Sequence, residues 1–325
     1  MVIENAPRCS FRLALWIVLF VLSGLAGPLI ITDINFSYDL PSYLLWPLYP
    51  MYAGNCLAGS FAPRLTRVQW SSSTKLFLLD VAAQALTNVG LLAIGPPFYA
   101  VLYKSITVFT GCLSLCLLPF PSQPSRTQWG AILLITLGLI VTSLDAIETL
   151  SFNGLLGCLV MLFGCMFFAA GAVVSELFLG VHGGPDGDLL PMQVAWAFGV
   201  EGIVACIFWA YFTLRTAPSD ARGWLSLTAL MVANAGHQAA WFTLVGQLGA
   251  CATAVLKAFQ SVCIFFTASI WFCDRDSAEC LSTEKVISFF VVTLGVLIYS
   301  WPRTSIAVSG MCNEASHSQP LRQSE

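Results

Sequence analysis

Long apolar segments recur along almost the whole chain, and this pattern limits the fold more than any other feature. Each segment is long enough to cross the roughly 30 Å hydrocarbon core of a bilayer as a helix. The segments are residues 13–31, 43–62, 76–95, 97–118, 127–144, 153–179, 190–214, 223–246, 249–272 and 284–301. In lipid, every backbone polar group must find a partner within the protein, which favours helices. The sequence therefore predicts an all-α integral membrane protein with ten transmembrane helices.

The composition agrees with a lipid environment. Of the 325 residues, 57% are hydrophobic and 10% are charged, whereas a soluble domain carries about 25% charged residues. The net charge of −3 predicts no nucleic-acid partner by bulk attraction. Segment 13–31 follows two arginines and has small residues near its end, as a signal peptide would. It is also long enough to span, and we expect it to be retained.

The short connections and the chain ends indicate an orientation. Eight of the 14 Lys and Arg residues fall on the side of the termini and four on the opposite side. The excess of basic residues on cytosolic loops predicts that both termini are cytosolic. Residues 1–12 would form a cytosolic N-terminus and residues 302–325 a polar, disordered cytosolic tail. The double proline at Pro96 and Pro97 predicts a turn between the third and fourth segments.

An internal repeat divides the chain. Residues 80–102 align without a gap on residues 234–256. The matched pieces belong to the third to fifth and the eighth to tenth segments, so the halves are residues 13–144 and 153–301. Because each half has an odd number of spans, the second half inserts in the opposite direction. The sequence predicts two inverted five-helix repeats, an arrangement common among secondary transporters.

Two lysines lie within predicted spans. Lys104 is in the fourth span and Lys257 in the ninth, and the repeat aligns Lys257 with Tyr103. A cation at the bilayer centre costs about 2.5 to 3.5 kcal/mol, so such residues usually face a polar cavity. Two cations on a cavity would suit a phosphate or carboxylate. The alternative is that each lysine snorkels to an interface or pairs structurally with a carboxylate.

Glu201 lies near the middle of the seventh predicted span. A buried carboxylate at this depth could neutralise Lys257 when the cavity is empty, or accept a proton during transport. Both roles are left open by the sequence, and we identify Glu201 as a candidate counter-ion or proton site.

Amides and an imidazole occupy matching spans of the two halves. Gln84 and Asn88 are four residues apart, as are Asn234 and Gln238, so each pair shares a helix face. Of these residues, Gln84, Asn88, Gln238 and His237 are the candidates to line the cavity, although hydrogen bonds between helices would explain all five equally well. His237 has no second His or Cys at ligand spacing, so neither a metal site nor a cofactor is predicted.

Twelve cysteines are present, without metal-ligand spacing. Cys273 and Cys280 flank a charged loop and could pair if that loop faces an oxidising lumen. We expect two free thiols rather than this disulfide.

Two sequence blocks resemble a known group. LDVAAQALTNVGLLAIGPPFYAVLYKSITVFTG (79–111) and RTQWGAILLITLGLIVTSLDA (126–146) are similar to the drug/metabolite transporter superfamily, in particular to the nucleotide-sugar transporters of solute carrier family 35. The QW pair opening a Gly-rich aliphatic span is the most specific part. The spacing of LLD, VGL and FTG and the EG of VEGIVACIF look closest to the F-type branch.

The resemblance implies ten spans, residence in endomembranes such as the Golgi, and alternating access around a central cavity. In nucleotide-sugar members, lysines on spans four and nine meet the nucleotide phosphates, and Lys104 and Lys257 occupy similar places. F-type relatives tend to carry arginine near the position of Tyr103, whose second-repeat equivalent falls nearer Gln260. We therefore add Tyr103 and Gln260 to the candidate substrate-binding residues.

The sequence thus predicts a transporter of an organic, anionic solute such as a nucleotide sugar or another phosphate-bearing molecule. An exporter of amphipathic, cationic or amino-acid-like metabolites is an alternative. A membrane scaffold or receptor without transport is an alternative of another class. With three histidines and no paired catalytic motif, we expect no enzyme. Homodimerisation is left open.

Overall fold

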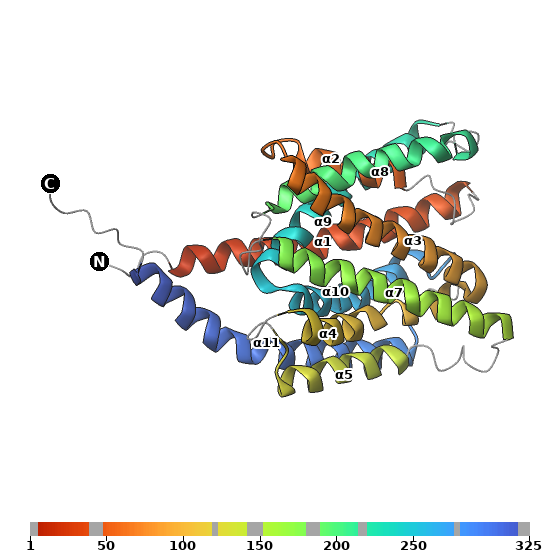
Figure 1. The fold of residues 1–325 in the computed structure, drawn as a ribbon. Helices are drawn as coiled ribbons and strands as arrows, with labels where there is room; N and C mark the ends of the chain where they lie inside the picture. The colour runs from red at the N-terminus through yellow and green to blue at the C-terminus, as the bar shows by residue number, and fades with distance from the viewer. Residues whose placement is uncertain are drawn as a thin grey trace.

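The structure, a computed structural model, describes residues 6–38, 48–118, 123–141, 152–179, 189–213, 220–275 and 280–317. All regular secondary structure in these ranges is α-helical, in agreement with the predicted class (Figure 1). The ten helices are α1 (Ala6–Tyr38), α2 (Leu48–Gly59), α3 (Arg67–Leu102), α4 (Ser105–Leu117), α5 (Arg126–Val141), α7 (Phe152–Phe178), α8 (Pro191–Thr213), α9 (Ala221–Leu248), α10 (Ala250–Phe272) and α11 (Thr283–His317). Each overlaps one of the predicted segments.

Four helices in the described ranges are long and apolar enough to cross a membrane by themselves. Their apolar stretches are Phe11–Ile34 of α1, Gly154–Phe178 of α7, Ala250–Phe272 of α10 and Thr283–Trp301 of α11. Two shorter apolar stretches, Ser105–Leu117 and Pro191–Ile207, accompany them. These helices are compatible with a membrane bundle.

The outer surface of the bundle also suits lipid. Large apolar side chains stand exposed along α7 and α11, among them Leu155 and Phe163 on the first and Leu294 and Leu297 on the second. In water a surface of this kind would favour aggregation, whereas in hydrocarbon it carries no penalty.

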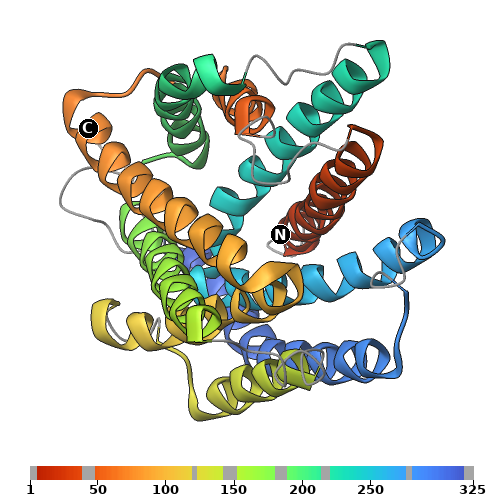
Figure 2. The same cartoon turned by 90° about the vertical axis from the view of Figure 1, so that its right-hand side faces the viewer.

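The helices pack against one another in long pairs. α3 lies along α7, α1 along α9, α5 along α11, and α2 lies against α8 and α9 (Figures 1 and 2). α10 contacts α1, α4, α7, α9 and α11. The start of α1 and the end of α11 lie at the same end of the bundle (Figure 1). Polar residues on α10 therefore lie among other helices rather than at the periphery.

The predicted turn at Pro96 and Pro97 is wrong, because α3 continues to Leu102. Proline fixes φ near −65°, which a helix accepts, and a helix can pass through it at the cost of one backbone hydrogen bond and a clash with the carbonyl of residue i−4. The break comes instead at Tyr103 and Lys104, which form the turn that starts α4. Lys104 is thus the residue before the first turn of α4, rather than a residue well inside a span.

The end of the chain also differs from the prediction. α11 continues through Pro302 to His317, so most of the segment predicted as a disordered tail is helical. Residues 318–325 and most of the predicted connections lie outside the described ranges.

Two features join helix ends on one side of the bundle. A disulfide links Cys273, after α10, to Cys280, before α11, so the expectation of two free thiols is wrong. Nearby, the Asp33 carboxylate of α1 accepts from Arg222 of α9 at 3.3 Å and from Arg275 at 3.1 Å. The ion pairs tie the end of α1 to the start of α9 and the end of α10.

A candidate solute-binding cavity

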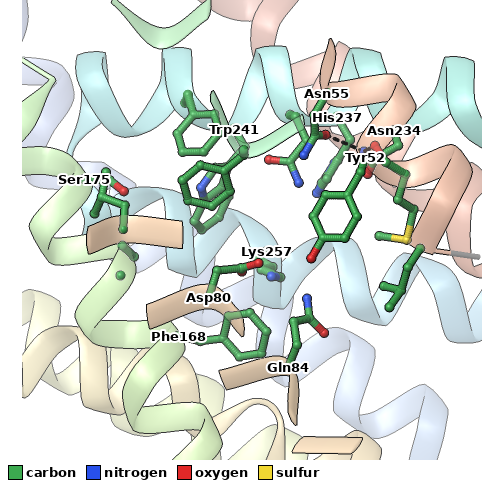
Figure 3. A pocket seen from close by; sticks show the side chains of 18 of the residues that line it. Tyr52, Asn55, Asp80, Gln84, Phe168, Ser175, Asn234, His237, Trp241 and Lys257 are labelled. Atoms are coloured by element: carbon green, nitrogen blue, oxygen red, sulfur yellow. Dashed lines mark hydrogen bonds between the residues drawn. The ribbon is translucent and has the colours of Figure 1, made fainter. Parts of the chain in front are cut away.

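A cavity of about 190 Å³ lies between the helices (Figure 3). Residues of α2, α3, α7, α8, α9 and α10 line it, together with the turn between α3 and α4. Its polar side chains are Tyr52, Asn55, Asp80, Gln84, Tyr103, Ser175, Asn234, His237, Gln238, Trp241 and Lys257. A cavity rich in hydrogen-bonding groups and enclosed by apolar helices is typical of a binding site.

The Lys257 ammonium is surrounded by aromatic rings. Nζ lies 5.1 Å from the ring centre of Trp241, 5.3 Å from that of Tyr103 and 5.7 Å from that of Phe168. It also donates a hydrogen bond to the Tyr103 hydroxyl at 3.4 Å. Each cation–π contact contributes about 0.5 to 1 kcal/mol or more. The three rings, called the aromatic cage below, hold the cation at the cavity. No carboxylate of the described residues forms a salt bridge with it.

Asp80 is the carboxylate that accompanies this cation. It lies on α3, lines the cavity, and interacts electrostatically with Lys257. Figure 3 shows Asp80 and Gln84 from one side and Tyr52 from another pointing toward Lys257. Asp80 and Gln84 share a face of α3 because they are four residues apart. The cavity thus presents opposite charges side by side.

An amide pair connects α2 to α9 at one wall. The Asn234 amide donates to the Asn55 side-chain oxygen and to the Met51 carbonyl, both at 2.6 Å. The two helices approach closely at Gly54, where a Cβ would lie 2.4 Å from the Met231 carbonyl oxygen. Any larger residue would push α2 away and separate the two amides.

His237 combines packing with a place on the wall. Its ring stacks on Phe20 of α1 with 4.7 Å between ring centres, and Nδ1 lies 3.4 Å from the Phe20 carbonyl oxygen. Within the described ranges no three His, Cys, Asp or Glu side chains gather as they would around a metal ion. His237 is therefore placed to orient a solute and to hold α9 against α1.

Five of the predicted binding residues come together in this cavity. Gln84, Tyr103, His237, Gln238 and Lys257 all line it. They lie on α3, in the turn between α3 and α4, on α9 and on α10, and only the packing of these elements brings them together.

The remaining predicted residues lie elsewhere. Lys104 is absent from the lining of the cavity and instead lines a second, much smaller pocket of about 10 Å³, which Tyr103 and Lys257 also line, with its Nζ 5.9 Å from the Tyr103 ring centre. Asn88 does not line either pocket. Gln260 is buried against α1, where a Cβ on Gly24 would lie 1.9 Å from its amide nitrogen. A role in solute binding for Lys104, Asn88 and Gln260 stays a prediction.

Glu201 also lies away from the cavity. Its carboxylate accepts a hydrogen bond from the Thr74 hydroxyl of α3, and it is absent from the cavity lining. The negative charge near Lys257 belongs to Asp80 instead. A proton-accepting role for Glu201 stays a prediction.

Several lining residues escaped the sequence reasoning. Tyr52 and Asn55 are on α2, which lies outside the aligned repeat, and the rings of Phe168 and Trp241 look like ordinary apolar core in sequence. One signal was available: Trp241 follows His237 by four residues and Asp80 precedes Gln84 by four, so both share a face with a predicted residue.

The comparisons with known proteins bear on the fold alone. No family model matches the chain, and no curated protein matches it. A solved structure described as "Crystal structure of protein" has a TM-score of 0.65 at 14% identity, over 91% of this chain and 98% of the other. At this identity the likeness extends to the arrangement of the helices and to nothing about activity.

Proposed function

We propose that the protein is a membrane transporter of a small organic solute that carries an anionic group, and that Lys257 binds this group. The observation that carries the proposal is the placement of a caged ammonium on a polar cavity between the helices. A cation inside a membrane bundle is costly unless it has a function or a partner. Because the aromatic cage holds the Lys257 ammonium by its rings, the ammonium can still form an ion pair with an anionic group of a solute.

The internal repeat supports an alternating-access mechanism. Residues separated by 154 positions occur together on the cavity wall: Asp80 with Asn234, Gln84 with Gln238, and Tyr103 with Lys257. The last pair is in contact, at 3.4 Å and with that same separation. Residues related by a two-fold axis meet when they lie close to it, so this contact favours a pseudo-two-fold axis through the cavity.

The helix contacts support the same symmetry. Suppose that α1 to α5 correspond in order to α7, α8, α9, α10 and α11. The two-fold operation then exchanges the α3–α7 pair with the α9–α1 pair, and the helices of both pairs pack along their length. The α2–α8, α4–α10 and α5–α11 pairs each map onto themselves and are also in contact. Two inverted five-helix repeats would have these pairings. Rocking of the halves would then open the cavity to each side in turn.

The disulfide supports an endomembrane location with cytosolic termini. Disulfides persist in oxidising compartments, so the loop holding Cys273 and Cys280 would face a lumen. The likeness of the sequence to solute carrier family 35 favours an organic phosphate or a nucleotide derivative as the solute.

Reconstitution tests the proposal. Purified protein in liposomes is screened for uptake of nucleotide sugars, organic phosphates and amino acids, beside protein-free liposomes and the Lys257→Ala variant. We expect at least one anionic solute to be taken up by the wild type and not by the variant. Uptake of no solute, or uptake that Lys257→Ala leaves unchanged, would reject the proposal in favour of a scaffold with a structural lysine.

A further inference from the structure

The Asp80 carboxylate has no hydrogen-bond donor among the residues that the structure describes. No Lys, Arg or His nitrogen of those residues lies within 4.0 Å of its oxygens either. Most acidic groups inside a bundle are paired, because an unpaired charge away from water is costly. Asp80 instead lines the cavity with its acceptor oxygens available.

Lys257 does not account for Asp80 by itself. The two groups interact through space, yet the ammonium is held by the Tyr103 hydroxyl and the aromatic cage rather than by direct contact with the carboxylate. If Asp80 served only to neutralise Lys257, direct hydrogen bonding would be the more stable arrangement. Both groups line the same cavity without an ion pair between them, so each can take its partner from a solute.

We propose that the cavity takes a small zwitterionic solute, with its acidic group on Lys257 and its primary ammonium on Asp80. This inference rests on the proposed function and adds a second, oppositely charged subsite to it. The carboxylate accepts hydrogen bonds from the solute ammonium, while the Lys257 ammonium donates to the solute phosphate or carboxylate. Neither charge of the solute is then left without a partner.

The dimensions of the cavity favour such a solute. Its volume of about 190 Å³ is below the 300 to 1,000 Å³ of pockets that hold drug-sized ligands. A phosphate or carboxylate joined to an amine by a short chain is of a size that suits this space. The amides of Gln84 and Gln238 on the wall can hydrogen-bond the polar atoms between the two charges.

A matched set of probes tests the inference with the full-length protein in liposomes. The probes are O-phosphoethanolamine, which has both charges, ethyl phosphate, which has only the anion, and ethanolamine, which has only the cation. We expect the wild type to prefer O-phosphoethanolamine to either single-charge probe by at least about tenfold, as one charge-assisted hydrogen bond allows. Asp80→Asn should bring O-phosphoethanolamine and ethyl phosphate to equal affinity, and Asp80→Glu should restore part of the preference.

Asp33→Asn is the matched control, because Asp33 is also a carboxylate but pairs with arginines away from the cavity. It should leave the preference unchanged. If the wild type takes ethyl phosphate as well as O-phosphoethanolamine, the zwitterion inference fails while the anion transporter stands. If it takes none of the three probes and no other anion, both fail. Should Asp80→Asn not fold, the wild-type preference and Asp80→Glu still decide the question.

Discussion

The Lys257→Met substitution gives the sharpest prediction about the cavity. Methionine keeps an unbranched apolar stem but removes the ammonium. A hydrogen bond between charged groups contributes about 1.5 to 3 kcal/mol, so the affinity for an anionic solute should fall by about 10- to 150-fold. The cage contacts are present in both the free and the bound protein, so they largely cancel from this difference.

The same substitution should change stability little. Three cation–π contacts at about 0.5 to 1 kcal/mol each are lost, and the cost of about 2.5 to 3.5 kcal/mol for holding a cation in the bundle disappears. These sums are similar, so we expect the variant to unfold near the wild-type temperature. Removing Lys257 leaves the Asp80 carboxylate without its positive neighbour, which could destabilise the variant. In that case the affinity for the anionic solute is measured on the double variant Lys257→Met, Asp80→Asn instead.

The assay is the Kd of the tightest-binding anion from the liposome screen, measured on purified protein. Lys104→Met is the matched control, because Lys104 lies beside the same tyrosine but is absent from the lining of the larger cavity. We expect it to change the Kd by less than about threefold, or ~0.7 kcal/mol. Unchanged binding in Lys257→Met, or an equal loss in Lys104→Met, would refute the assignment of the anion site.

Three further substitutions test other parts of the structure. Gly249→Ala should lower the free energy of unfolding by about 1 to 3 kcal/mol. Gly249 has φ 86°, and a Cβ there would lie 2.9 Å from the Glu176 carboxylate that caps α10. An unfolding temperature equal to that of the wild type in a thermal melt would contradict this. Glu201→Gln should keep the hydrogen bond from Thr74 and leave solute affinity unchanged, while an altered Kd would place Glu201 in the binding site. Asp33→Asn should cost less than about 1 kcal/mol, because its ion pairs are exposed, and a larger loss in the same melt would show that they hold the helix ends together.

Local patterns in the sequence predicted much of the fold. Each of the ten described helices overlaps a predicted apolar segment, because hydropathy is a property of contiguous residues, although several helix ends differ from the predicted bounds. Charge inside such a segment is also visible in sequence, which is why Lys257 was identified. The spacing of Gln84 on α3 and of His237 and Gln238 on α9 indicated polar faces for the same reason.

Only the tertiary structure decided which of these residues share a cavity. The cage of Tyr103, Phe168 and Trp241 comes from three regions of the chain, and the ring positions depend on how α7, α9 and the turn between α3 and α4 pack around Lys257 of α10. The same packing sets Asp80 beside Lys257 and leaves Glu201 with Thr74. The sequence shows which side chains a helix carries. Which of them come into contact depends on the rotation of each helix about its axis, and packing against neighbouring helices fixes that rotation.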